Sequence, residues 1–193
     1  MKEFSLSGQW KLCAASVEAN NYGIKDGSVF TMPIPGSVQD ALIDQAIVPD
    51  PYCGCNELET LFIGKSDWNI SRIFDLAFDS SKHYILRLEK VDTVASLYLN
   101  DAFVASFDNE HRIYDLDVTS FLKSGENSIE FRFRSTEKLA IERSEKLDHA
   151  VPCSRYKYDS PHRNLVRKAQ CNAAWDWGLC LQTIGVYEDI VLY

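Results

Sequence analysis

The sequence has 193 residues, of which 46% are apolar, 25% charged and 12% aromatic. A chain of this length and composition can bury a sizeable core, so it is expected to form a globular domain and not a disordered segment. Twenty Lys and Arg residues against 28 Asp and Glu residues give a formal charge of −8, and no segment carries a basic run. This balance disfavours a nucleic acid as a partner.

The chain carries no sign of a membrane span or a secretion signal. No stretch approaches the roughly 18 uncharged apolar residues that a membrane span requires, and residues 1–9 lack the basic start and apolar run of a signal peptide. We therefore expect a cytoplasmic protein with no membrane partner. Its six cysteines are expected to be reduced thiols, because a chain of this length does not need disulfides.

No cofactor is expected. The pair Cys53 and Cys55 is separated by one residue, which is shorter than the Cys-x-x-Cys spacing of zinc sites, and no nearby histidine completes a ligand set. The sequence therefore gives only a weak metal signal.

Apolar and polar residues alternate through the middle of the chain, as in strands with one buried face. Three such strands are predicted around residues 68–76, 84–88 and 129–133. Residues 95–107 predict a hairpin, because the apolar alternation is interrupted by the polar pair Asn100-Asp101 and then resumes. A further strand is expected at residues 114–118, and one more at residues 184–193.

Helical signals are few. Ser37 is a good N-cap for a short helix that ends near Gln45, with Asp40 close to the positive end of the helix. Residues 136–147 predict a second helix, which is rich in charge and is expected on the surface; a long loop is expected at 148–163. Short strands with little helix predict an all-β, jelly-roll β-sandwich, formed as one domain over residues 1–193.

The segment Trp175-Asp176-Trp177 has the most unusual local composition. An indole face packs well against the C–H face of a pyranose, and a carboxylate accepts hydrogen bonds from two adjacent hydroxyl groups, so the tripeptide is a candidate sugar-binding site. The alternative is structural: the indoles close one end of the sandwich, and Asp176 caps a turn or pairs with Arg167. Composition alone favours this alternative, because aromatic residues of β-sandwiches are usually in the core.

A series of short segments along the chain favours the sugar-binding alternative. They are Leu6-Ser7-Gly8-Gln9-Trp10, Pro35-Gly36-Ser37-Val38, Ile47-Val48-Pro49-Asp50-Pro51-Tyr52, Asn56-Glu57, Asp67-Trp68, Val91-Asp92-Thr93-Val94-Ala95, Leu99-Asn100 and Asp117-Val118-Thr119. In these segments, and in the same order over residues 5–193, the chain resembles the sugar-binding domain of glycoside hydrolase family 2. The run from Arg167 to Gly178 is most similar to the β-mannosidase branch.

The resemblance implies a galactose-binding-like jelly roll at the N-terminus of a multidomain exo-glycosidase that removes terminal β-D-mannose. Its ligand would be a β-mannoside or manno-oligosaccharide, and its partners the downstream domains of the same polypeptide. Asp176 would bind sugar hydroxyl groups, and Trp175 and Trp177 would shape the pocket. The family's two catalytic glutamates lie on a barrel of roughly 250 residues, so no catalytic residue is assigned here and the 193-residue chain alone is expected to be inactive.

Two alternatives stay open. The chain is either a free-standing carbohydrate-binding module without catalysis, or the same domain from another family 2 glycosidase, such as one that acts on a glucosaminide, galactoside or glucuronide. Binding of manno-oligosaccharides by the chain distinguishes the first alternative, and the preferred substrate of the parent enzyme distinguishes the second.

Overall fold

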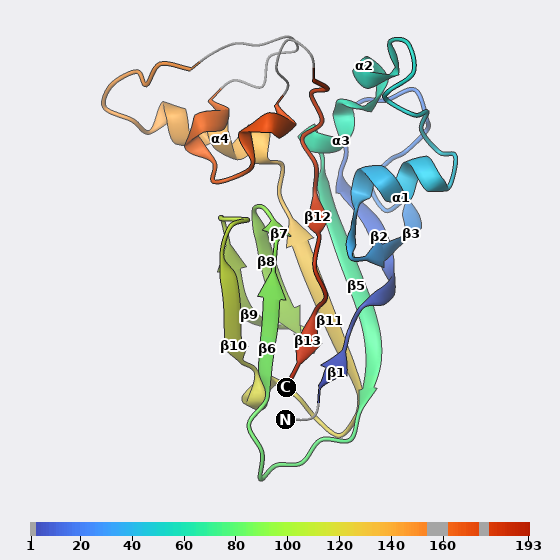
Figure 1. Cartoon of the computed structure of the whole chain (residues 1–193), viewed down its shortest axis with the longest axis vertical. Coiled ribbons are helices and arrows are strands. Elements are labelled where there is room, and N and C mark those ends of the chain that lie inside the picture. Colours follow the sequence, from blue (N-terminus) through green and yellow to red (C-terminus); the bar gives the residue numbers. More distant parts are fainter. Residues whose placement is uncertain (1–2, 154–161, 174–177) are drawn as a thin grey trace.

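The computed structural model describes residues 3–153, 162–173 and 178–193. Its strands form a six-stranded sheet in the order β3-β2-β5-β11-β8-β9, a four-stranded sheet in the order β1-β13-β6-β10, and a small sheet β4-β12-β7. The two larger sheets face each other as the layers of a sandwich (Figure 1). Every pairing between these strands is antiparallel. The predicted all-β sandwich is thus confirmed.

The elements of the described residues have the following bounds. The strands are β1 (Phe4–Ser5), β2 (Gly8–Ser16), β3 (Val29–Ile34), β4 (Gly36–Ser37), β5 (Asp67–Leu76), β6 (Ile85–Glu89), β7 (Val91–Asp92), β8 (Ala95–Leu99), β9 (Ala102–Phe107), β10 (Ile113–Asp117), β11 (Gly125–Phe133), β12 (Gly185–Val186) and β13 (Val191–Leu192). The helices are α1 (Val38–Asp44), α2 (Asn56–Thr60), α3 (Phe62–Lys65) and α4 (Thr136–Glu145), with short 3-10 turns η1 (Thr119–Phe121), η2 (Arg163–Leu165) and η3 (Gln170–Asn172).

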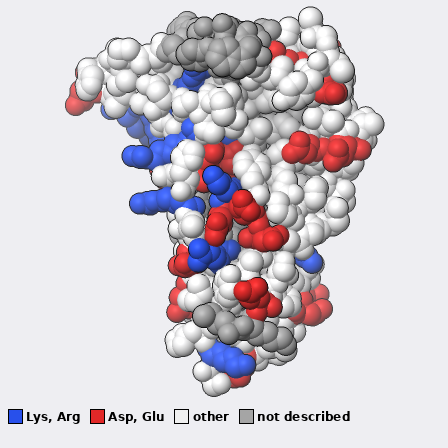
Figure 2. All heavy atoms as spheres, in the orientation of Figure 1, with Lys and Arg blue, Asp and Glu red and all other residues white. Residues whose placement is uncertain are grey.

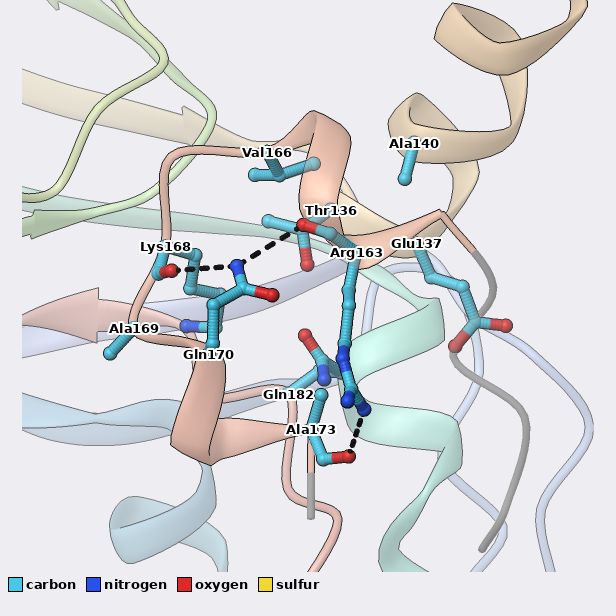
Figure 3. A pocket seen from close by; sticks show the side chains of 10 residues that line it. All are labelled: Thr136, Glu137, Ala140, Arg163, Val166, Lys168, Ala169, Gln170, Ala173 and Gln182. Carbon is cyan, nitrogen blue, oxygen red and sulfur yellow. Dashed lines mark hydrogen bonds between the residues drawn. The ribbon is translucent and has the colours of Figure 1, made fainter. Parts of the chain in front are cut away.

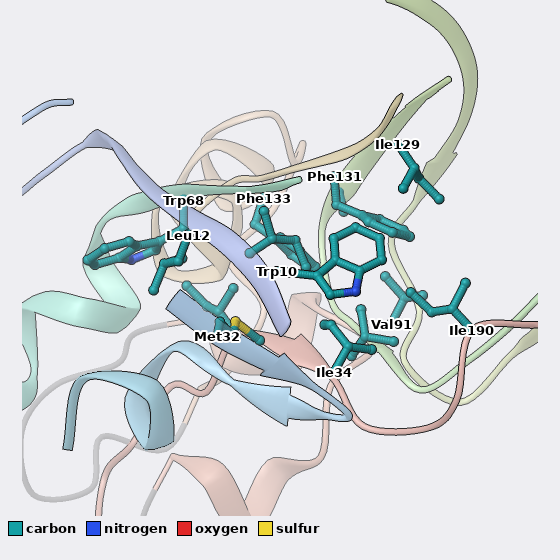
Figure 4. Close-up of a cluster of buried hydrophobic side chains, with 14 of the residues drawn as sticks. Trp10, Leu12, Met32, Ile34, Trp68, Val91, Ile129, Phe131, Phe133 and Ile190 are labelled. Carbon is teal, nitrogen blue, oxygen red and sulfur yellow. The ribbon is translucent and has the colours of Figure 1, made fainter. Parts of the chain in front are cut away.

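The core lies between the two sheets, because apolar residues alternate with polar ones along the central strands, as predicted. Alternate residues are buried on β11 from 127 to 133 and on β5 from 68 to 76, except at Arg72, which is half-buried. The two strands pair so that Phe131 lies opposite Ile70 and Phe133 opposite Trp68. The indole of Trp10 packs against Phe131 with ring centroids 6.0 Å apart (Figure 4). Its N–H donates to the carbonyl of Leu6 at 2.9 Å, so this buried polar group is satisfied.

The β8–β9 hairpin is confirmed, but its register differs from simple alternation. Asn100 and Asp101 both have positive φ, 49° and 66°, which is the geometry of the tight turn predicted for this polar pair. A bulge then places Leu97 opposite Ala105 and Tyr98 opposite Phe103. Because one extra residue moves a strand's side chains to the other face, Phe103 is 54% exposed and not in the core.

The two predicted helices are confirmed. The Ser37 side chain caps α1 by accepting from the backbone N–H of Asp40, and Ser135 caps α4 in the same way. The short helices α2 and α3 were not predicted, and neither begins with a side-chain cap that the sequence could signal. Among the described residues, no helix is long and apolar enough to cross a membrane.

The prediction of one strand over residues 184–193 is wrong in its extent. The chain forms two short strands instead: β12 pairs with β4 and β7, and β13 pairs with β1 and β6. Ile190 lies between them and is buried, while Glu188 and Asp189 are exposed. The polar pair thus interrupts the ladder, and the two halves join different sheets.

Candidate functional site

The predicted sugar-binding residues Trp175, Asp176 and Trp177 lie outside the described residues, so their prediction stays open. The structure does describe the chain on both sides of them. Ala173 and Cys180 form an antiparallel bridge, which brings the two flanking segments together. The guanidinium of Arg163 donates to the carbonyl of Ala173 at 2.7 Å (Figure 3).

The segment after the tripeptide is held by polar side chains from the helices that cap this end of the sandwich. The backbone N–H of Cys180 donates to the carboxylate of Glu57 in α2. Gln39 in α1 uses both ends of its amide: its N–H donates to the carbonyl of Gln182 at 2.8 Å, and its oxygen accepts from the N–H of Ile184 at 3.2 Å. Three backbone groups are therefore bound by two side chains.

A glycine allows α3 to approach this segment closely. A Cβ atom at Gly64 would clash with the side chain and the carbonyl of Gln182. The absence of a side chain at position 64 thus permits contact between the backbone of the helix and Gln182.

A buried ion pair supports the same segment from inside the sandwich. The ammonium of Lys168 donates to the carboxylate of Asp92, to the carbonyl of Thr183 at 2.8 Å and to the Thr183 hydroxyl at 3.1 Å. Asp92 also accepts from the hydroxyls of Thr183 at 2.9 Å and Tyr187 at 2.5 Å. Both charges are thus fully hydrogen-bonded, as a buried pair requires.

Burial and the neighbouring carboxylate raise the pKa of the Tyr187 hydroxyl, so this group stays protonated and donates.

Glu110 is a second buried carboxylate next to this pair. Burial is the main cause that raises the pKa of its carboxyl group, and the charge of Asp92 acts in the same direction. Its Oε2 has no hydrogen-bond partner among the described residues. The exposed side chain of His111 lies beside this carboxylate, with its Nδ1 3.9 Å from Oε1.

Two hollows border these residues, and only one of them is large enough to hold a sugar. The enclosed one in Figure 3, between α4 and η3, has about 10 Å³, which is the space of one water molecule at most and excludes a monosaccharide. The open one has about 570 Å³, within the range of ligand sites. It is lined by Ser37, Gln39, Asp40, Ile43, Asp50, Pro51, Tyr52, Glu110, Ala169, Asn172, Leu181, Thr183 and Tyr187.

The open hollow has an acidic and aromatic rim. Figure 2 shows acidic side chains gathered over α1, the helix that carries Asp40 and Asp44, while Lys and Arg gather on the other side of the molecule, beside α4 and β10. Tyr52 is 80% exposed at the rim and offers a ring face to a ligand. Such a surface suits a ligand with hydroxyl donors and an apolar face.

The described part of the chain holds no group of three or more His, Cys, Asp or Glu side chains that could bind a metal ion. Cys53 and Cys55 are exposed. The weak metal signal of the sequence is therefore not accompanied by a ligand cluster in these parts of the structure.

The sequence did not identify Glu57, Gln39, Asp92 or Lys168 as site residues, although all four lie in or beside the matching segments. Asp92 had no signal in the sequence, because it lies in the two-residue strand β7, which was not predicted. The groups that these four side chains bind are set by tertiary contacts, which cannot be seen in the sequence.

Comparison with known proteins supports the same fold and adds a family. The sequence model of the family "Glycosyl hydrolase 2 galactose-binding domain-like" matches residues 10–188. The chain is 34% identical to a β-mannosidase of Bos taurus over 192 residues, and 31% identical to a probable β-mannosidase of Caenorhabditis elegans over 196 residues. These alignments cover 96% and 97% of this chain but only 21% of each relative.

Solved structures agree. The crystal structure of a β-D-mannosidase from Dictyoglomus thermophilum superposes with a TM-score of 0.88 at 28% identity, and the match covers 100% of this chain and 22% of that one. An exo-chitosanase from Amycolatopsis orientalis gives a TM-score of 0.63 at 15% identity, which shows the shared fold alone.

The facing antiparallel sheets and their end hollow define a galactose-binding-like β-sandwich. The chain belongs to the galactose-binding-like domain family of glycosyl hydrolases 2, and the relatives quoted above are glycoside hydrolases named as β-mannosidases.

Proposed function

We propose that this chain is a domain of a longer glycoside hydrolase that removes terminal β-D-mannose from the non-reducing ends of β-mannosides and manno-oligosaccharides. One observation carries the proposal: curated β-mannosidases are 31% and 34% identical to the chain across 97% and 96% of its length. The chain spans only 21% of those relatives, so catalysis is assigned to other parts of the parent polypeptide.

We propose that Trp175, Asp176 and Trp177 bind the terminal sugar. A carboxylate flanked by indoles can accept hydroxyl hydrogen bonds while the rings cover the apolar face of the pyranose. The described neighbours support this role, because Asn172 and Leu181, on either side of the tripeptide in the chain, line the open hollow of about 570 Å³. A monosaccharide fits a space of this size.

We further propose that residues 1–193 form one domain and that its partners are downstream domains of the same polypeptide. The single family match over residues 10–188 supports one domain. We also propose the cytoplasm as the compartment, because the six cysteines are free thiols.

The parent enzyme and a panel of nitrophenyl glycosides test the proposal. We expect the highest kcat/KM on the β-D-mannoside, and a loss of at least about 100-fold for Asp176→Ala, because a charged hydrogen bond to the sugar disappears. Asp75→Ala is the matched control, since Asp75 is exposed on β5 and lies opposite Glu126 at the far end of that strand.

Preference for a glucosaminide, galactoside or glucuronide would contradict the proposed substrate. An unchanged kcat/KM in Asp176→Ala would contradict the proposed role of the tripeptide.

A further inference from the structure

The open hollow is lined by three carboxylates. Glu110 lies in its inner wall and is only 6% exposed, whereas Asp40 and Asp50 are exposed at its rim. No Lys, Arg or His stands among the described residues that line this hollow. Asp40 belongs to the acidic side chains that gather over α1 in Figure 2. A concave surface with charge of one sign attracts ligands of the opposite sign.

Glu110 carries a negative charge that its surroundings compensate only in part. Its Oε2 is buried and accepts no hydrogen bond from the described residues. The exposed His111 lies 3.9 Å from Oε1, which is longer than a hydrogen bond. The ammonium of Lys168 is bound to Asp92, so one buried cation faces two buried carboxylates. Burial, and then the charge of Asp92, raise the pKa of the Glu110 carboxyl group, as expected where positive charge is missing.

Most hydrogen-bond donors of the lining side chains are already used within the protein. Ser37 donates to Asp40 at 2.6 Å, Gln39 to the carbonyl of Gln182 at 2.8 Å, Asn172 to the Thr183 hydroxyl at 2.9 Å, and Thr183 and Tyr187 to Asp92 at 2.9 and 2.5 Å. The hollow therefore offers a ligand chiefly carboxylate oxygens, which accept. Ammonium and guanidinium groups carry only donors and match such a site, whereas a neutral hydroxyl or amide also brings acceptors.

The aromatic rim suits the same kind of ligand. The ring of Tyr52 is 80% exposed where it lines the hollow. A cation that lies over the face of a tyrosine ring is attracted by the ring's electrons. The volume of about 570 Å³ is large enough for such a group together with the molecule or side chain that carries it.

We propose that the open hollow binds an organic cation through an ammonium or guanidinium group, with Glu110 as its main acceptor and Asp40 and Asp50 as acceptors at the rim. The group belongs either to a small molecule or to a Lys or Arg side chain of another domain of the parent polypeptide. The second source rests on the proposed function, whereas the preference for a cation rests on the contacts above.

The first experiment titrates the 193-residue chain with methylguanidinium and with methylurea, which has nearly the same shape and no charge. ¹⁵N–¹H spectra at pH 7.5 and low ionic strength follow the backbone amides of Asp40, Tyr52 and Glu110. We expect saturable shifts with methylguanidinium and none with methylurea at the same concentrations. Glu110→Gln should weaken the binding of methylguanidinium at least about tenfold, because a hydrogen bond between two charged groups is lost.

Asp44→Asn is the matched control. It removes one negative charge from α1, the helix that carries Asp40, but Asp44 is exposed and does not line the hollow. Binding should change less than about twofold, because water and salt screen an exposed charge outside the site. Asp40→Asn is expected to weaken binding and repeats the test should Glu110→Gln fail to fold, since asparagine keeps an oxygen for the Ser37 hydroxyl.

The second experiment identifies the source of the cation in the parent enzyme. If a basic side chain of another domain fills the hollow, methylguanidinium will not bind the wild-type parent. Glu110→Gln will then lower the melting temperature of the parent and raise that of the isolated chain, because only in the parent is the buried carboxylate paired. If the cation is a small molecule, the parent will bind methylguanidinium as the chain does.

Equal or absent binding of the two probes by the chain would overturn the inference, as would methylguanidinium binding that both Glu110→Gln and Asp40→Asn leave unchanged. A parent that neither binds methylguanidinium nor loses stability in Glu110→Gln would also overturn it, because a group without positive charge would then fill the hollow. A wild-type parent without β-mannosidase activity would refute the proposed function alone, and the titration of the chain would still decide whether the hollow prefers a cation.

Discussion

The buried carboxylate of Glu110 is expected to lower the stability of the fold. Its carboxylate is buried beside that of Asp92, and Oε2 has no hydrogen-bond partner among the described residues. An unsatisfied buried group costs about 1–3 kcal/mol. Burial is the largest cause of the raised pKa of Glu110, and the charge of Asp92 acts in the same direction. Lys168 is already bound to Asp92 and compensates Glu110 only in part.

This raised pKa predicts a pH-dependent stability. A folded-state pKa above the unfolded value means that the folded protein binds the extra proton, so Glu110 destabilises the fold at neutral pH and this penalty disappears as the pH falls toward the usual glutamate range. We expect Glu110→Gln to be more stable than wild type at pH 7.5, with a difference that shrinks toward about pH 4.5.

Urea denaturation of both proteins between pH 5 and 8 measures this difference. Glu126→Gln is the control, because Glu126 is exposed on β11. A Glu110→Gln variant that is less stable than wild type at pH 7.5 would show that the carboxylate is compensated in the fold.

The buried pair Lys168–Asp92 should behave as one unit. Lys168→Met leaves the fully buried carboxylate of Asp92 without its cation, and removal of one partner of such a pair costs about 3–5 kcal/mol. The double variant Asp92→Asn, Lys168→Met removes both charges and is expected to recover at least half of this loss. Denaturant midpoints of the single and double variants measure the coupling, and additive losses would argue against it.

The sequence could not pair these two residues, because they are 76 positions apart. Lys168 stands in the polar stretch after Arg167, where an exposed side chain is the natural expectation, and Asp92 stands in a two-residue strand too short to show a pattern. The tripeptide at 175–177, which the sequence predicts as a sugar-binding site, has local composition as its signal. Glu57, Asp92 and Lys168 are polar residues of ordinary type whose contacts form only in the folded chain.

At the level of elements, strands with long alternation were predictable and irregular ones were not. β5 and β11 carry ten and nine residues with clear parity, and both were predicted with the correct buried face. β9 has the same kind of pattern, but its bulge opposite Leu97 and Tyr98 reverses the side of Phe103. The alternation of apolar and polar residues does not reveal a bulge. Alternation alone therefore places Phe103 on the wrong face of the strand.

Two phenylalanines on β9 therefore give a sharp test of the bulge. Phe107 is 2% exposed and packs against Phe131 and Tyr114, whereas Phe103 is 54% exposed beside Tyr98. We expect Phe107→Ala to cost about 3–5 kcal/mol and Phe103→Ala less than about 1 kcal/mol, since only the first creates a core cavity. Equal losses in urea denaturation would mean that both rings are buried and that the bulge is absent in solution.

At the level of the whole molecule, the chain spans about a fifth of the length of the relatives quoted above, and the large hollow at one end of its sandwich is open. The alignments cover 97% and 96% of this chain but only 21% of each relative. Such coverage is expected of one domain of a longer polypeptide, in which other domains can complete a binding site. Small-molecule sites bury most of the ligand surface, so one wall of such a site binds weakly. The 570 Å³ hollow is open to solvent in the described structure and fits this description.

The isolated 193-residue chain is therefore expected to hydrolyse no nitrophenyl glycoside and to bind D-mannose or manno-oligosaccharides with a dissociation constant weaker than about 1 mM, which corresponds to about 4 kcal/mol. Calorimetry detects any tighter binding, and chemical shifts report the weak range. Saturation at micromolar sugar, lost in Asp176→Ala, would identify the chain as a free-standing carbohydrate-binding module, because a complete pocket would then exist without any further domain.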